Sequence, residues 1–464
     1  MMKTTNRDER IGDAPAGFRC RLCGGSHLES VVDLGMSPLC ESFLTAKEAA
    51  GAESFYPLHA FVCRDCLLVQ LDEFVSGREI FREGYAYFSS YSTSWVEHAK
   101  RFAVETIKAE GLSPGDRIYE VASNDGYLLQ HFVDRGYSVL GIEPAANCAR
   151  AAEERGIETL VTYLDAETGK SIAASRGRAR LVVANNVLAH VPDLGGFVRG
   201  LDALLDDDGL LSIEIQHLES LVRLNQFDTI YHEHFCYFSL HVLIELFRRH
   251  GLAVTDAILL PTHGGSLRVH VRRRPADAVT PTESMREILQ REVDAGLVGL
   301  EGYRSFERAV HDVKWELVEF LIDSRRKGLR VAGYGAPGKG NTLLNFCGIR
   351  RDLIDFVVDR NPHKQGRFLP GTHIPILAPE ALDEYRPDRV LIMPWNLRDE
   401  IAAQLDPLVQ RGTRLAVPIP RPSVLVEGTW VPWRELHRAD DRFDESGTIT
   451  QSRRRGAETE EVVG

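Results

Sequence analysis

Two stretches of the chain alternate apolar strands with amphipathic helices, which is the pattern of a parallel α/β sheet. The first stretch opens with an apolar strand at Arg117–Ala122, followed by a polar loop and a helical pattern over Tyr127–Arg135. It continues with a strand at Ser138–Ile142, a helix at Ala145–Arg155 and an apolar strand at Leu181–Ala184. We therefore expect a doubly wound, Rossmann-like domain in the middle of the chain.

The second stretch repeats this alternation nearer the C-terminus. A strand at Leu329–Tyr334 leads through a glycine-rich loop into a helix that ends at Cys347, and further strands follow at Ile354–Val358 and Arg389–Met393. Between the two stretches, helical periodicity with charged faces fills Pro281–Lys327 and predicts a bridging helical arm. The fold class is thus α/β, with two Rossmann-like doubly wound domains behind a smaller N-terminal domain.

Composition and charge narrow the class of protein. The chain has 464 residues, 44% of them hydrophobic, which suits several globular domains. No apolar run approaches the roughly 20 residues of a membrane span, and the polar N-terminus lacks a signal-peptide core, so we expect a cytoplasmic protein without a membrane partner. The net charge of −12 argues against a nucleic-acid partner. We place the domains at residues 1–80, 81–275 and 276–428, with a flexible tail at 429–464.

Four cysteines predict a metal centre in the first domain. Cys20 and Cys23 form one pair, and Cys63 and Cys66 form another, each at the spacing of a zinc knuckle. Two such turns make a closed tetrahedral site, which predicts a structural Zn²⁺ rather than four unrelated reduced thiols. Cys40 lies between the pairs without a partner at ligand spacing, and we interpret it as a buried thiol.

The middle domain carries the features of an adenosine-binding site. The first strand runs into the loop Ser123-Asn124-Asp125-Gly126, where a ligand can approach the backbone. The second strand ends in Glu143-Pro144, and an acid at this position can accept hydrogen bonds from two ribose hydroxyls. A later strand ends in Asn185-Asn186, close to His190 in sequence. The alternative for His190 is a histidine that only caps a helix start.

The most unusual segment of the chain is Tyr231-His232-Glu233-His234-Phe235-Cys236-Tyr237. It concentrates imidazoles, a carboxylate and phenols, the groups needed to remove a proton and to hold a developing oxyanion. The alternative is a loop with one structural histidine and aromatic packing. A second aromatic segment, residues 85–92, interleaves tyrosines with serines and is typical of a loop that lines a ligand pocket.

A loop in the third domain predicts a phosphate site. The sequence Gly335-Ala336-Pro337-Gly338-Lys339-Gly340-Asn341 brings backbone amides, a lysine and a helix N-terminus together. It is not a P-loop, because glycine rather than serine or threonine follows the lysine. The alternative is a scaffold domain with a loop that is merely rich in glycine.

These motifs together resemble a known family. Glu120 opens a loop similar to the first motif of class I S-adenosylmethionine (SAM) methyltransferases, although Ala122 stands where that motif usually has glycine. The order of paired CxxC knuckles, SNDG, NVLAHVPD and YHEHFCY is similar to that of sugar C-methyltransferases over roughly residues 18–425. The resemblance implies methylation of a carbon, commonly C3, of a nucleotide-linked 4-keto-6-deoxyhexose.

The resemblance also implies residue roles. His234 would be the general base, Tyr231 and Glu233 would hold the sugar, and His190 with Tyr85 would stabilise the enolate oxygen, with Tyr87 as the alternative to Tyr85. Residues implied to bind SAM are Glu120, Ala122, Ser123, Asn124, Asp125, Gly126, Glu143, Pro144, Asn185 and Asn186. Residues implied or predicted to bind the sugar nucleotide are Tyr87, His263, Gly264, Gly265, Gly335, Lys339, Asn341, Asp359 and Lys364.

Three readings of the function therefore stay open at this point. The favoured one is a monomeric SAM-dependent C-methyltransferase that acts on a nucleotide sugar, with dTDP as the expected nucleotide, in deoxysugar biosynthesis. The second is O- or N-methylation of a related sugar, which needs no enolate-stabilising group. The third is a zinc-ribbon binding protein with degenerate sheets.

Overall fold

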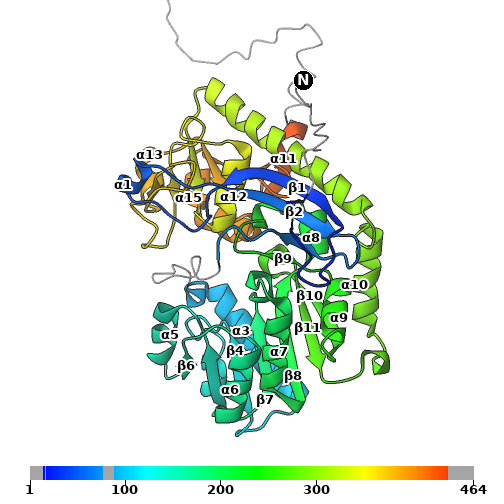
Figure 1. Ribbon diagram of the computed structural model, residues 1–464. Helices are drawn as coiled ribbons and strands as arrows, with labels where there is room; N and C mark the ends of the chain where they lie inside the picture. The colour runs from blue at the N-terminus through cyan, green and yellow to red at the C-terminus, as the bar shows by residue number, and fades with distance from the viewer. Residues whose placement is uncertain (1–13, 16, 77–87, 437–464) are drawn as a thin grey trace, which may run out of the picture.

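The computed structural model describes residues 14–15, 17–76 and 88–436 and contains three sheets. The sheet of the middle domain lies at one end of the molecule and the C-terminal sheet at the other (Figure 1). The strands β1 and β2 lie beside the C-terminal sheet, and the long helix α11 runs along them (Figure 1). Among the described residues, no helix has the length and apolar character required to cross a membrane.

The middle sheet has the order β10-β11-β8-β7-β4-β5-β6. The strands β6, β5, β4, β7 and β8 pair in parallel, whereas β11 pairs antiparallel with both β8 and β10. Its strands are β4 (Arg117–Val121), β5 (Ser138–Ile142), β6 (Thr159–Leu160), β7 (Ala179–Asn185), β8 (Leu205–Gln216), β10 (Ala253–Leu260) and β11 (Ser266–Arg272). Its helices are α3 (Thr93–Glu110), α4 (Gln130–Val133), α5 (Ala146–Glu153), α6 (Ala166–Arg176), α7 (Leu194–Leu204) and α9 (Leu240–Arg248). The predicted doubly wound architecture is confirmed here.

The C-terminal sheet has the order β14-β13-β12-β15-β16-β17-β18, parallel as far as β16 and antiparallel after it. Its strands are β12 (Val331–Tyr334), β13 (Val357–Val358), β14 (Ile376–Leu377), β15 (Arg389–Ile392), β16 (Arg414–Val417), β17 (Ser423–Val426) and β18 (Thr429–Pro432). Its helices are α12 (Gly338–Cys347), α13 (Ala381–Tyr385), α14 (Arg398–Gln404) and α15 (Asp406–Val409). This second Rossmann-like sheet was also predicted from the sequence.

The N-terminal sheet joins residues that are far apart in sequence. Its strands β1 (Leu28–Ser37), β2 (Tyr56–Cys63) and β3 (Val69–Leu71) are completed by β9 (Cys236–Tyr237). The strand β9 belongs to the YHEHFCY segment and pairs antiparallel with β3. The short helix α1 (Ala46–Ala49) lies in the same N-terminal part of the chain. The first domain therefore supplies the sheet on which the most unusual segment of the chain is held.

The remaining elements connect these layers. They are α8 (Leu218–Arg223), α10 (Glu283–Asp294), α11 (Glu301–Arg326) and the short turns η1 (Ser89–Tyr91), η2 (Leu188–His190), η3 (Phe227–Thr229), η4 (Thr262–Gly264), η5 (Ala276–Ala278) and η6 (Trp395–Leu397). One continuous hydrophobic core contains side chains from β1, β2, α8, η3, α11 and the C-terminal sheet. The C-terminal sheet and the N-terminal strands thus share a core instead of meeting only at their surfaces.

Two elements are shorter than the sequence pattern predicts. The helix after the first strand begins at Gln130, not at Tyr127, because Gly126 has a φ of +79° and the intervening residues form turns. The strand predicted over Ile354–Val358 pairs only at Val357–Val358, because the amide of Ile354 closes a turn on the carbonyl of Arg350.

Candidate functional site

A single cavity of about 1270 Å³ connects the carboxyl edge of the middle sheet with the C-terminal domain. Its walls include Glu143 and Asn185 from the middle sheet, His234 from the YHEHFCY segment, and Lys339 from the start of α12. The volume exceeds that of typical small-molecule pockets, so it has room for more than one ligand. It is the natural candidate for an active site shared by two molecules.

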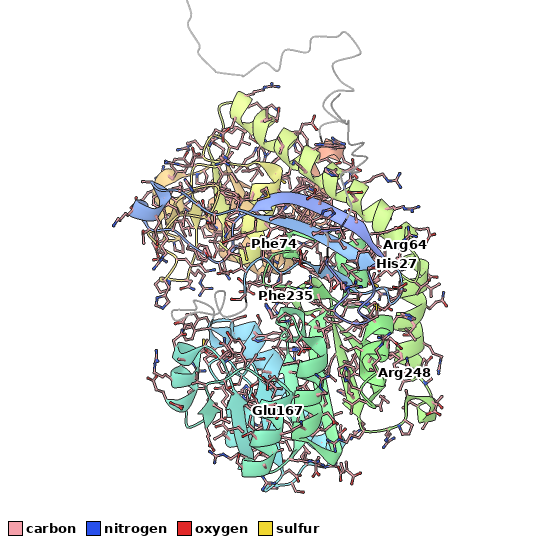
Figure 2. The ribbon with its side chains drawn as sticks, in the orientation of Figure 1. His27, Arg64, Phe74, Glu167, Phe235 and Arg248 are labelled. Atoms are coloured by element: carbon pink, nitrogen blue, oxygen red, sulfur yellow. The ribbon has the colours of Figure 1, made fainter. Side chains whose placement is uncertain are left out.

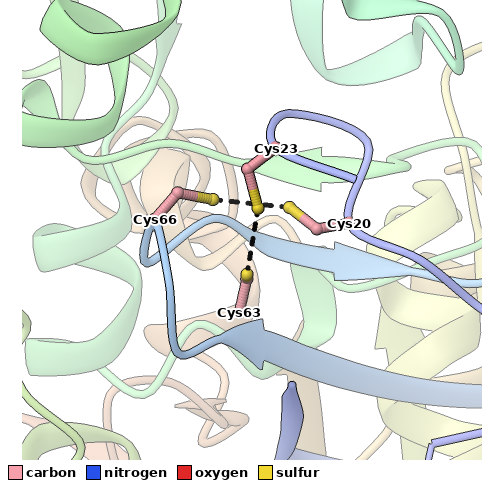
Figure 3. A group of neighbouring side chains, drawn as sticks. All are labelled: Cys20, Cys23, Cys63 and Cys66. Carbon is pink, nitrogen blue, oxygen red and sulfur yellow. Dashed lines mark hydrogen bonds between the residues drawn. The ribbon is translucent and has the colours of Figure 1, made fainter. Parts of the chain in front are cut away.

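The four paired cysteines converge on one point outside this cavity (Figure 3). Their Sγ atoms all lie within 4.8 Å of one another, with Cys20 and Cys66 at 3.4 Å and Cys23 and Cys63 at 3.5 Å. A zinc ion with Zn–S bonds of about 2.3 Å requires sulfur atoms roughly 3.8 Å apart, so the four residues fit Zn²⁺. Because every ligand comes from the protein, the centre is structural, as predicted.

At one end of the cavity, the loop after β4 meets the end of β5. The carboxylate of Glu143 accepts hydrogen bonds from the amides of Asn124 at 2.9 Å and Ala145 at 2.8 Å. Burial raises the pKa of Glu143, and these two amide hydrogen bonds oppose the rise. The carboxylate is thus held in one orientation at the cavity wall, where ribose hydroxyls can donate to its oxygens. This arrangement fits SAM.

The backbone conformation of Ala122 shows why glycine is usual at this position. It lies in the left-handed region with a φ of +58°, a conformation that glycine adopts without the cost that a Cβ atom imposes. Asn124 in the same loop also has a positive φ of +49°. The backbone of this chain therefore keeps the open loop despite the replacement.

The residues predicted to bind SAM divide into two groups. Those that line the cavity are Ala122, Asn124, Glu143, Pro144, Asn185 and Asn186. Those that lie behind the wall are Glu120, Ser123, Asp125 and Gly126. Burial raises the pKa of Glu120 well above its usual value, and Asp125 accepts a hydrogen bond from the hydroxyl of Ser90. The second group supports the loop from below.

His234 lines the cavity, and its two ring nitrogens have different hydrogen-bond environments. Its Nδ1–H donates to the carbonyl of Thr229 at 2.9 Å, which leaves the lone pair of Nε2 available. Burial lowers the pKa of His234 well below its usual value, and the nearby His190 lowers it further. The imidazole is therefore neutral at physiological pH, which is the form that a general base requires.

Two aromatic rings flank this imidazole. The ring of Tyr231 lies 4.1 Å from the ring of His234, and the ring of His190 lies 4.7 Å from it at an interplanar angle of 72°. Burial lowers the pKa of His190 to about 4, so His190 is also neutral. The structure thus brings together His190, Tyr231 and His234, as the sequence motifs predict.

Glu233 lines the cavity on the side of the N-terminal domain. Its carboxyl group lies beside Cys40, whose Sγ is 3.8 Å from Oε1 of Glu233. Burial, together with the charge of Glu41, raises the pKa of Glu233 to about 8. Cys40 is the buried thiol that we expected, but it also contacts the candidate active site. A pKa of about 8 favours the protonated form of Glu233 at neutral pH, in which its carboxyl group can donate a hydrogen bond.

The predicted substrate residues also divide into two groups. His263, Lys339 and Lys364 line the cavity, whereas Gly264, Gly265, Gly335, Asn341 and Asp359 do not. Burial lowers the pKa of Lys339 to about 8, and burial lowers that of His263 to about 4. Lys364 forms an ion pair with Glu41 at 3.5 Å.

The residues of the predicted phosphate loop make other contacts. The amide of Asn341 donates to the carbonyl of Cys40, and the carboxylate of Asp359 accepts from the amide of Ala336. A Cβ atom on Gly338 would lie 2.8 Å from the carboxylate of Glu41, so an acidic side chain lies against the helix start. Lys339 and Lys364 are therefore the cationic groups of this loop region that face the cavity.

Tyr85 and Tyr87 lie outside the described residues. The described end of the same segment contacts the loop after β4, because the amide of Ser89 donates to Oδ1 of Asn124 at 2.8 Å. The side chains of Ser89 and Ser92 line the cavity. The predicted role of this segment as a pocket lining stays a prediction for the two tyrosines.

One charged cluster in the cavity wall was not predicted. Glu214 is fully buried and accepts hydrogen bonds from His98 at 2.9 Å, Arg268 at 3.1 Å and Thr262 at 2.9 Å. Burial opposes ionisation of Glu214, but the hydrogen bond and charge of His98 and the charge of Arg268 outweigh it and lower its pKa. His98 and Arg268 line the cavity. No local motif marks these residues, which come from different elements.

Three family models match successive parts of the chain. A zinc binding domain matches residues 20–81, a methyltransferase domain matches residues 95–257, and a C-methyltransferase C-terminal domain matches residues 261–420. The chain is 38% identical over 407 residues to the C-methyltransferase NovU of Streptomyces niveus, an alignment that covers 88% of this chain and 96% of that protein.

Solved structures resemble parts of the chain more distantly. Magnesium protoporphyrin IX methyltransferase from Synechocystis, solved with bound SAM, is 15% identical with a TM-score of 0.30, over 42% of this chain and 89% of that chain. The PH0226 protein from Pyrococcus horikoshii is 12% identical with a TM-score of 0.34, over 42% of this chain and 99% of that one.

The relationship to NovU extends over almost the full length of both chains, and the three domain models follow in the same order as the three parts of the structure. A C-methyltransferase must activate a carbon atom, and the neutral imidazole in the cavity is suited to that task. The chain belongs to the C-methyltransferase family and is an enzyme with a structural zinc-binding domain.

Proposed function

We propose that the enzyme transfers a methyl group from SAM to the carbon beside the ketone of a nucleotide-linked 4-keto-6-deoxysugar. The observation that carries this proposal is the tautomer of His234, whose Nδ1–H is engaged by Thr229 while Nε2 faces the cavity. A ring C–H beside a ketone is acidic enough for a neutral imidazole to remove its proton. Methylation of oxygen or nitrogen would not require such a base beside groups that stabilise an enolate.

The flanking residues support the same chemistry. Bound SAM would supply an electrophilic methyl group from the end of the cavity lined by Glu143. Tyr231, which lies against the base, can donate a hydrogen bond to a sugar oxygen, and the protonated Glu233 can donate another. Donors fixed in place before the reaction stabilise negative charge without further reorganisation.

The nucleotide would bind at the opposite end. Lys339 and Lys364 place two cationic side chains on the cavity wall in the C-terminal domain, where a diphosphate can bind. This assigns one substrate to each end of the cavity, with the base between them. The size of the cavity supports simultaneous binding of a donor and a sugar nucleotide.

A His234→Ala variant tests the role of the base. We expect it to bind SAM with unchanged affinity by calorimetry and to lose turnover by about 100-fold or more. In wild-type enzyme with S-adenosylhomocysteine in place of SAM, solvent deuterium should enter the carbon next to the ketone, and in the variant it should not. His241, an exposed histidine at the start of α9, provides the matched control, since His241→Ala should leave both measurements unchanged.

Two results would contradict the proposal. Full turnover by His234→Ala would remove His234 as the base. A methylated oxygen or nitrogen in the product, identified by mass spectrometry and NMR with a panel of keto-sugar nucleotides, would exclude carbon methylation of these substrates.

A further inference from the structure

The carbonyl that orients His234 belongs to a turn with its own unusual support. Thr229 is the last residue of η3 (Phe227–Thr229), and its carbonyl accepts the Nδ1–H of His234 at 2.9 Å. If this carbonyl moved, the imidazole would lose the contact that selects its tautomer and its direction. The position of η3 therefore determines whether the lone pair of His234 points into the cavity.

The C-terminal domain holds this turn by one hydrogen bond from a distant side chain. The indole Nε1–H of Trp395 donates to Oδ2 of Asp228 at 2.7 Å, and 167 residues of chain separate the two. Asp228 is fully buried, and Trp395 is 6% exposed. A hydrogen bond to a buried carboxylate is among the stronger side-chain contacts. Its loss is costly because the buried carboxylate of Asp228 would no longer receive the indole N–H.

Other contacts hold the same turn from the sides. The ring of Phe227 packs edge-on against Phe346 of α12 with centroids 5.3 Å apart. The hydroxyl of Thr229 donates to the carbonyl of Gln226, and the amide of Gln216 donates to that hydroxyl. These contacts keep η3 folded, so removal of the indole N–H should shift the turn without unfolding it.

The face of the same indole ring contacts a cationic side chain of the cavity. The ammonium group of Lys339 lies 4.2 Å from the centroid of the Trp395 ring and donates to Oδ1 of Asn396. Lys339 lines the cavity in the region assigned to the sugar nucleotide. One side chain thus contacts both the predicted substrate lysine and the turn that orients the base.

We propose that Trp395 is a positioning residue, which holds Asp228 and thereby fixes the Thr229 carbonyl that directs His234 into the cavity. This inference rests on the proposed role of His234 as the base. It assigns to the C-terminal domain a part in orienting the base in addition to binding substrate. Loss of the indole N–H should lower kcat and leave the affinity for SAM unchanged, because the donor end of the cavity is formed by other elements.

The decisive variant is Trp395→Phe, which keeps an aromatic ring and removes the donor. We expect kcat to fall by about tenfold or more, because small misplacements of a catalytic group have effects of this order. Solvent deuterium exchange into the substrate carbon should slow by the same factor. The matched control is Trp430→Phe, since Nε1 of Trp430 donates to Asp399 at 2.8 Å outside the cavity wall, and its kcat should stay within about twofold of wild type.

A second pair of variants covers the case in which Trp395→Phe fails to fold. Asp228→Asn keeps an oxygen that accepts the indole hydrogen bond, so it should retain kcat. It also removes a negative charge that acts on Lys339, so the KM for the sugar nucleotide should change. Asp228→Ala keeps no acceptor and should lose kcat as Trp395→Phe does. Equal kcat values for Asp228→Asn and Asp228→Ala, or wild-type kcat in a folded Trp395→Phe, would overturn the inference.

The two proposals fail in different ways. If His234→Ala is fully active, the base has been assigned wrongly, whatever Trp395→Phe does. If His234→Ala is inactive but folded Trp395→Phe behaves like Trp430→Phe, the base stands and the positioning role is refuted.

Discussion

Gln70 of the zinc-binding domain pairs directly with Cys236, two residues after the candidate base, across the antiparallel strands β3 and β9. The amide of Leu71 also donates to the carbonyl of Phe235 at 2.9 Å, and the guanidinium of Arg21 lies 5.3 Å from the ring of Phe235. Figure 2 shows Phe235 near the centre of the molecule, between the domains. The metal-bearing domain thus forms part of the support of the candidate active site.

This pairing predicts that loss of zinc impairs catalysis as well as folding. Cys63 ends β2 and Cys66 lies three residues before β3, so an opened metal site frees the strand that pairs with β9. We expect Cys63→Ser to lower the zinc content from about one ion per chain and to lower kcat more than the affinity for SAM. Metal analysis, calorimetry and turnover assays would measure the three quantities.

His27 offers a control beside the zinc site. It is exposed and pairs with Asp65 at 3.4 Å, but it is not a ligand. His27→Ala should keep both zinc and turnover. A Cys63→Ser protein that lacks zinc and turns over like wild type would show that the pairing of β3 with β9 does not depend on the metal.

Glu143 should determine the affinity for SAM and have little effect on kcat. Its carboxylate is fixed by two backbone amides at the cavity wall, where it can accept from a ribose. Glu143→Gln keeps the shape but weakens acceptance, so we expect the Kd for SAM to rise by about 10-fold or more, which corresponds to loss of a hydrogen bond to a charged group. At saturating SAM, kcat should change much less.

The matched control for Glu143 lies on the next helix. Glu153 is an exposed residue of α5, and Glu153→Gln should leave SAM binding unchanged in calorimetry. Unchanged SAM affinity in a folded Glu143→Gln protein would show that the donor does not bind at the end of β5.

The parts of this site that the sequence predicts are those encoded in short, contiguous patterns. The zinc ligands follow from two CxxC spacings, and Glu143 follows from its place at the end of an apolar strand. His234 stands in a segment whose mixture of imidazoles, phenols and a carboxylate is not required by a helix or a strand. In each case the chemistry and the local structure are a few residues apart, so no knowledge of tertiary packing is needed.

The contacts that the sequence does not reveal join distant elements. Trp395 and Asp228 are 167 residues apart, and Glu214 meets His98 at a separation of 116 residues and Arg268 at a separation of 54 residues. Asn341 appeared suited to a phosphate loop, but its amide is engaged by the carbonyl of Cys40, 301 residues earlier. Such pairs depend on how the domains pack, which periodicity and motif spacing do not encode.

The raised pKa of Glu233 predicts that the free energy of unfolding depends on pH. Burial raises its pKa in the folded protein from 4.5 to about 8, so the folded state holds a proton that the unfolded chain releases near its usual pKa. Its contribution to stability is therefore complete below the unfolded pKa and is lost as the pH rises toward the folded pKa. The slope in this window is at most about 1.4 kcal/mol per pH unit.

Glu233→Gln should abolish this part of the pH dependence, because an amide carries no ionisable proton and keeps the size of the side chain. Urea unfolding of both proteins across the same pH range isolates the effect, since every other group titrates in both. Glu41→Gln is an informative companion, because the charge of Glu41 is the second cause of the raised pKa and its removal should move the window to lower pH. Parallel stability curves for wild type and Glu233→Gln would mean that Glu233 ionises normally in the folded enzyme, in which case it could not donate a hydrogen bond to the sugar at neutral pH.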